Sequence, residues 1–191
     1  MTEFEFIFVL YALVLGLSMV ELLSGFGRTM EYKFAREAED KVFHIGWLTP
    51  LFAIFVLLDL ISFWLFAWVI RDLIEFNSAT VAGVTAFASS YYLAARLVFP
   101  SDPESFTDLD VHFYRVRRVV LGILIALVFI QWAYLLSQTS LAMISGNTVA
   151  IWLTVLLVSL MGAAMIWRKD AINIAILLAL NIRYLLMYLV F

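Results

Sequence analysis

Long apolar stretches alternate with short polar connections along almost the whole chain. A helix needs ~20 mostly apolar residues to cross the ~30 Å hydrocarbon core of a membrane, and six stretches satisfy this requirement. The predicted spans cover residues 4–27, 43–70, 77–99, 118–137, 141–167 and 171–191. The pattern therefore predicts an all-α, polytopic transmembrane helix bundle with six spans, in which residues 1–191 form a single integral membrane domain.

Two connections carry turn and capping signals. Asp102 precedes Pro103 as a helix N-cap precedes proline at the first helical position, and Thr107 to Asp110 has capping-box spacing. We therefore expect the helix of the fourth span to start early, with residues 108–118 at or beyond the membrane surface. Residues 137–140 are expected to turn the chain between spans four and five, and residues 145–147 offer a competing turn.

The distribution of cations predicts the orientation of the bundle. All but two of the 12 Lys and Arg residues lie in or beside the connections after spans one, three and five: Arg28, Lys33, Arg36, Lys41, Arg96, Arg115, Arg117, Arg118, Arg168 and Lys169. The exceptions are Arg71 in the second connection and Arg183 within span six. Because connections rich in Lys and Arg stay in the cytoplasm, both termini are predicted to lie outside, most simply across a bacterial inner (cytoplasmic) membrane.

Composition restricts the classes of function. Hydrophobic residues make up 65% of the chain, which leaves little sequence for a separate soluble catalytic domain. The absence of cysteine excludes disulfides, thiolate metal sites and thiol nucleophiles. Without a His and carboxylate cluster at ligand spacing we predict no metal site, and we predict no catalytic residue and no nucleic-acid partner.

Polar side chains near the middle of the spans are the first candidates for a site. Asp59 and Arg183 fall at similar depth in spans two and six, so they are expected to form an ion pair, because an isolated charge in hydrocarbon is costly. Gln131 and Asn181 fall in the same layer. One interpretation is a substrate or proton site at the midplane, and the other is a structural salt bridge that fixes two helices.

A second polar group is predicted in the cytoplasmic leaflet. Glu21 has Arg96 or His44 as a candidate partner, although Arg96 is also placed to extend towards the lipid headgroups. His44 and His112 both fall at the predicted cytoplasmic face. One interpretation is that the two imidazoles are the axial ligands of a haem, and the other is that they are hydrogen-bonded or solvated and bind no cofactor. No other cofactor is predicted.

Two packing features are expected from the sequence. Small side chains recur at four-residue intervals in span three, and this pattern favours close approach of another helix, within the chain or in a dimer. The stripe consists of Ser78, Ala82, Ala86, Ser90 and Ala94. In span two, Pro50 is expected to free the carbonyl of Gly46 and to bend the helix.

Several segments resemble a group of short six-helix bacterial membrane proteins of uncharacterised function. The resembling segments are Leu15-Gly16-Leu17, Leu23-Ser24-Gly25 with Arg28, His44 with Trp47, Asp108-Leu109, His112-Phe113-Tyr114 and Arg117-Arg118. The resemblance extends over more than half of the chain. It implies the six-helix architecture and no activity.

Three functions agree with these patterns. The midplane charges and compact connections favour a transporter or channel for a small solute or ion. The small size and the aromatic content of 16% suit an accessory or assembly subunit of a larger membrane complex, or a homo-oligomer. The third hypothesis is a haem-binding redox protein or another membrane enzyme. In each case the lipid bilayer is the first partner.

Overall fold

The fold is a bundle of long helices in a computed structural model that describes residues 2–38, 43–106, 108–138 and 148–190. Within these ranges the helices are α1 (Glu3–Ala38), α2 (Leu48–Val69), α3 (Ser78–Val98), α4 (Leu109–Gln138), α6 (Thr148–Ile166) and α7 (Asp170–Val190), with short 3-10 turns η1 (Arg71–Leu73) and η2 (Pro103–Ser105). Each of the six α-helices is long and apolar enough to span a membrane. The predicted all-helical, six-span architecture is confirmed to that extent.

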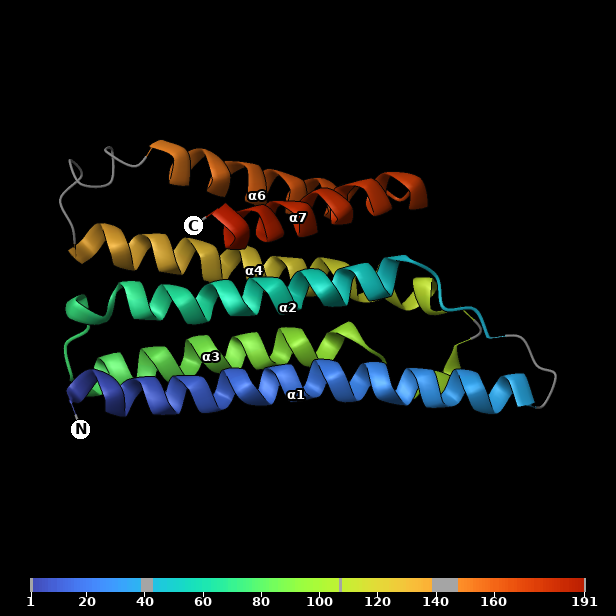
Figure 1. Cartoon of the computed structure of the whole chain (residues 1–191), viewed down its shortest axis with the longest axis horizontal. Helices are drawn as coiled ribbons and strands as arrows, with labels where there is room; N and C mark the ends of the chain where they lie inside the picture. The colour runs from blue at the N-terminus through green and yellow to red at the C-terminus, as the bar shows by residue number, and fades with distance from the viewer. Residues whose placement is uncertain (1, 39–42, 107, 139–147, 191) are drawn as a thin grey trace.

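Successive helices run in opposite directions, so both termini lie towards the same end of the bundle (Figure 1). We call this the terminal end, and we call the opposite end, which carries Arg36, Arg96, Arg118 and Arg168, the basic end. Helix α2 is central and packs against α1, α3, α4 and α7. In α2, Phe52, Phe55, Val56 and Leu60 are fully buried. On the surrounding helices, Leu13 of α1, Phe129 of α4 and Leu186 of α7 are exposed, as suits contact with lipid.

Two helices extend beyond their predicted spans. Helix α4 begins at Leu109, which confirms the expected early start, and Asp102 caps η2 by accepting from the N–H of Glu104. Thr107, residues 139–140 of the turn predicted at 137–140, and residues 145–147 lie outside the described residues, whereas residues 137 and 138 still belong to α4. Helix α1 continues to Ala38, which makes it ~54 Å long at 1.5 Å per residue and longer than the hydrocarbon core is thick.

The predicted bend at Pro50 is wrong. Helix α2 begins at Leu48, and the first backbone hydrogen bond of its start joins the N–H of Leu51 to the carbonyl of Trp47. Pro50 therefore lies in the first turn, where an N–H has no partner within the helix. No carbonyl loses a hydrogen bond, so the proline does not interrupt the helix.

The start of α2 is capped by a carboxylate from another helix. Oδ1 of Asp110 in α4 accepts from the N–H groups of Leu48 at 3.1 Å and Thr49 at 3.4 Å. The Thr49 hydroxyl donates in return to the carbonyl of Leu109 at 3.0 Å. A Cβ on Gly46 would overlap the Asp110 carboxyl group, so this close approach requires glycine. The contacts join the beginnings of α2 and α4 at the basic end.

The predicted packing stripe of α3 is wrong for most of its length. Ser78, Ala82 and Ala86 are exposed, whereas α3 packs through Ala88 and Ala95, together with Ala94 at the end of the stripe. Four residues turn an α-helix by about 40° more than one full turn, so four such steps wind by about 160° around the axis. A stripe with this spacing cannot stay on one face over the whole helix.

A buried arginine closes the α6–α7 connection. Arg117 in α4 is 1% exposed, and one of its nitrogens, Nη1, donates to the carbonyls of Ala164 and Trp167 and to Oδ1 of Asn173. The last carbonyls of a helix lack partners within the helix and carry partial negative charge. Arg117 therefore caps the end of α6, a role that its position among the loop cations did not indicate.

Candidate midplane site

A single carboxylate lies inside the apolar body of α2. Asp59 is 1% exposed and lies ~16 Å along the helix from Leu48. An ionised carboxylate at this depth is costly unless other groups donate hydrogen bonds to it or pair with it. The contacts of Asp59 therefore determine what the centre of the bundle is able to do.

Two tyrosines from different helices contact the Asp59 carboxyl group. The hydroxyl of Tyr184 in α7 donates to Oδ1. The hydroxyl of Tyr91 in α3 lies 3.1 Å from Oδ2 and 2.7 Å from the carbonyl oxygen of Val56. Both tyrosines are buried, so Asp59 is held on two sides by α3 and α7.

Two further tyrosine hydroxyls bind the backbone of α2 on either side of Asp59. Tyr188 of α7 donates to the carbonyl of Leu58 at 2.5 Å, and Tyr11 of α1 donates to the carbonyl of Phe63 at 3.0 Å. The tyrosines were not predicted as site residues. A tyrosine in the middle of a predicted span was the available signal, because its hydroxyl needs a partner in hydrocarbon.

A cavity of about 990 Å³ reaches Asp59 between α2, α4, α6 and α7. Its walls come from the halves of these helices that lie nearer the terminal end, including Gln131, Thr154 and Arg183. Towards the basic end the bundle is filled by four fully buried residues, Phe55, Leu124, Leu177 and Leu180. Asp59 therefore lies at the inner limit of the cavity.

Arg183 shares the cavity with Asp59, but the direct ion pair expected from the sequence is wrong. The Nε of Arg183 donates to the carbonyl of Leu153 at 3.1 Å, and its guanidinium lies over the ring of Tyr184, 4.8 Å from the centroid. Its Nη1 is buried and has no hydrogen-bond partner. The tyrosine hydroxyls provide the donors that Asp59 was expected to obtain from Arg183, and the guanidinium turns towards α6.

The structure places the two predicted amides differently. Gln131 of α4 lines the cavity with Asp59 and Arg183. Asn181 does not, and its Nδ2 donates to the carbonyls of Leu51 and Leu177 at 3.0 and 2.9 Å. Asn181 thus ties α7 to the beginning of α2. The proposed common role of the four residues stays a prediction.

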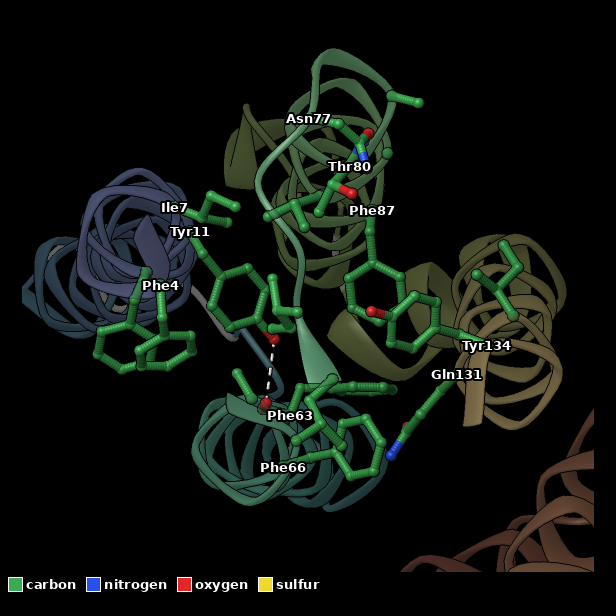
Figure 2. A pocket seen from close by; sticks show the side chains of 18 residues that line it. Phe4, Ile7, Tyr11, Phe63, Phe66, Asn77, Thr80, Phe87, Gln131 and Tyr134 are labelled. Atoms are coloured by element: carbon green, nitrogen blue, oxygen red, sulfur yellow. Dashed lines mark hydrogen bonds between the residues drawn. The ribbon is translucent and has the colours of Figure 1, made fainter. Parts of the chain in front are cut away.

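A smaller cavity of about 410 Å³ adjoins the first at the terminal end, between α1, α2, α3 and α4 (Figure 2). Most of its wall is apolar, with Phe4, Ile7, Phe66 and Phe87 among its labelled residues. Gln131 belongs to the walls of both cavities, as do Phe63, Phe66 and Ile70. The amide side chain of Gln131 is the polar side chain among these four shared wall residues.

The predicted cytoplasmic-leaflet residues form separate contacts at the basic end. Oε1 of Glu21 forms ion pairs with Arg96 and, at 3.3 Å, with Arg28. Of the two candidate partners of Glu21, the structure selects Arg96, which therefore does not extend alone towards the headgroups. The side chain of His44 is 70% exposed, with Nδ1 3.9 Å from Asp108, and Nε2 of His112 lies 3.1 Å from the carbonyl oxygen of Leu97. Haem binding by the histidines stays a prediction.

No model of a protein family matches the chain, and neither does any curated protein or any solved structure. The residues themselves therefore provide the basis for assigning a function.

Proposed function

We propose that the chain is a transporter of a small solute, with Asp59 as a proton-binding group at the inner limit of the larger cavity. One observation carries this proposal: a buried carboxyl group near the middle of a helix long enough to span a membrane contacts two tyrosines and lines a cavity in the half of the bundle nearer the terminal end. Intramembrane carboxyl groups in contact with cavities serve as ion and proton sites in many transporters. We further propose that both termini lie outside a bacterial inner membrane, so that the cavity opens outwards.

The contacts of Tyr91 support proton binding at Asp59. A hydroxyl has one hydrogen, and Tyr91 has two acceptors within reach, with Val56 the nearer. When Asp59 is ionised, Tyr91 donates to Oδ2. When Asp59 carries a proton, it donates to the Tyr91 oxygen while Tyr91 donates to Val56. Both protonation states therefore have a complete set of hydrogen bonds, as a group that gains and loses a proton in hydrocarbon requires.

Transport also requires that the cavity open alternately at the two ends of the bundle. This requirement is testable without knowledge of the substrate, because the chain has no cysteine. Ser62 lines the cavity next to Asp59, so Ser62→Cys provides a label site inside it. We expect a membrane-impermeant maleimide to modify Ser62→Cys rapidly from the terminal end and more slowly, but measurably, from the basic end, in membrane vesicles of opposite orientation.

Val155→Cys is the matched control, because Val155 is exposed on α6 and does not line the cavity. It should resist the maleimide from both sides if it faces lipid. Modification of Ser62→Cys from the terminal end alone would contradict transport.

One-sided modification would favour the second candidate, an accessory subunit of a larger complex. The exposed small residues of α3 favour this alternative, because Ser78, Ala82 and Ala86 leave room for a helix of another chain. Such a subunit would use the cavity for binding and would not need to open it at the basic end.

A further inference from the structure

Arg183 brings a cation to the larger cavity and forms no direct ion pair with Asp59, the carboxylate that shares the cavity with it. Its Nη1 is buried without a partner, and Asp59 is occupied by Tyr91 and Tyr184. A buried polar atom without a partner calls for an explanation, and a missing ligand that would bind it is one such explanation. A guanidinium in hydrocarbon has strong reason to bind an anion.

The orientation of the guanidinium is fixed by its other contacts. Nε donates to Leu153 of α6, and the planar group lies over the ring of Tyr184. These two contacts leave the Nη side for a ligand. A planar, oriented guanidinium matches the two oxygens of a carboxylate, which it binds through parallel hydrogen bonds.

The remaining wall of the cavity determines the body of that ligand. Most of its residues are apolar or aromatic, including Phe66, Trp132, Leu135 and Met187. The Thr154 hydroxyl is occupied by the carbonyl of Ala150. The volume of about 990 Å³ is at the upper end of what small-molecule sites provide. A ligand with one charged group and an apolar body suits these walls.

We propose that the larger cavity binds a small organic monoanion, an aromatic or aliphatic carboxylate, with its charged group on Arg183 and its body against Phe66 and Trp132. This inference rests on the proposed function and names the substrate class of the same site. Since Asp59 and Arg183 balance each other in the empty cavity, a bound anion adds one negative charge. Protonation of Asp59 restores neutrality, so with each anion one proton is taken from the solvent and binds to an oxygen of the Asp59 carboxylate, while the anion itself is chemically unchanged.

The groups that face Asp59 leave the proton with this carboxyl. Helix α1 contributes Tyr11, α3 contributes Tyr91, and α7 contributes Tyr184 and Tyr188 besides Arg183. The wall residues from α4 and α6 include no titratable side chain. Tyrosine hydroxyls and guanidinium groups keep their protons at neutral pH. Asp59 is the group left to change its protonation state when an anion binds.

Three probes of nearly equal shape and different charge test the inference: benzoate, the neutral benzamide and the cationic benzamidine. We expect calorimetric titration of the full chain in nanodiscs at pH 7 to show binding of benzoate and at least ~10-fold weaker binding of the other two. Arg183→Gln should weaken benzoate binding by at least ~10-fold, and Arg183→Lys should retain part of the affinity. Arg71→Gln, at an exposed cation near the terminal end, is the matched control and should bind as the wild type does.

Proton uptake is measured by repeating the benzoate titration in two buffers with different heats of ionisation. We expect the wild type to take up about one proton per benzoate, and we expect Asp59→Asn to bind benzoate without proton uptake. Arg183→Lys keeps the test decisive if Arg183→Gln does not fold, because it preserves the charge and loses the planar fork.

Three results would overturn the inference. The first is that benzamidine binds most tightly of the three probes and that its binding is lost in Asp59→Asn. The others are that all three probes bind equally well or that none of them binds. The outcome is separable from that of the proposed function. Benzoate binding together with one-sided labelling of Ser62→Cys would support the anion site and contradict transport. Two-sided labelling without benzoate binding would do the reverse.

Discussion

The hydroxyl of Tyr184 donates to Oδ1 of Asp59, and this hydrogen bond joins α7 to α2 at the inner limit of the larger cavity. Tyr184→Phe removes the hydroxyl and keeps the ring under Arg183. We expect it to lower the free energy of unfolding by ~1–3 kcal/mol, because a buried acceptor loses its donor. Unfolding by denaturing detergent in mixed micelles measures the difference.

Tyr92→Phe is the control for this substitution, because Tyr92 is exposed on α3. Its unfolding should match the wild type. If Tyr184→Phe were as stable as Tyr92→Phe, the hydrogen bond would contribute nothing to the packing of α7 on α2.

Two alanines of α3 that are two positions apart should respond oppositely to enlargement. Ala88 is fully buried, whereas Ala86 is exposed. We expect Ala88→Leu to cost ~1–3 kcal/mol through overpacking and Ala86→Leu to be tolerated in the monomer. Thermal unfolding in mild detergent compares the two variants. If Ala86→Leu destabilised the protein as much as Ala88→Leu does, the face of α3 that carries Ala86 would pack against another helix.

The membrane spans were predictable because the apolar runs that define them are local. Asp59 and Arg183 were also recognisable, since any charge within such a run stands out. The contact partners were not, because hydropathy does not distinguish Tyr91 and Tyr184 from other aromatic residues of the spans. Which hydroxyl reaches Asp59 depends on how α3 and α7 are rotated about their axes.

Two other misjudged features depend on distant parts of the chain. Arg117 was counted among the loop cations, but its partners include the carbonyls of Ala164 and Trp167, near the end of α6. Pro50 was expected to bend a helix because the predicted span begins at residue 43, which would place Pro50 within the helix. The helix begins only at Leu48, so Pro50 lies in its first turn. The start is set by the carboxylate of Asp110, which comes from α4.

The trans-helix cap at the start of α2 gives a third prediction. Asp110→Ala leaves the N–H groups of Leu48 and Thr49 without their acceptor, so we expect a loss of ~0.5–2 kcal/mol in unfolding free energy. Gly46→Ala should also destabilise, because the added methyl group occupies the place of the Asp110 carboxyl group. Asp72→Ala is the control, since the side chain of Asp72 is 82% exposed. The double variant should lose less than the sum of the two single losses, because Asp110→Ala vacates the space that the methyl group needs.

The orientation of the bundle is tested by single cysteines at its two ends. Ser105 in η2 and Thr2 before α1 are both exposed, and the chain contributes no cysteine background. The cations at the basic end predict that this end faces the cytoplasm. In intact bacterial cells whose outer membrane has been made permeable, we expect an impermeant maleimide to modify Thr2→Cys and not Ser105→Cys. Ser105→Cys should react after the inner membrane is lysed, which shows that the residue itself is reactive. Modification of Ser105→Cys alone in intact cells would reverse the orientation, and the larger cavity, whose walls lie in the half of the bundle nearer the terminal end, would then lie on the cytoplasmic side.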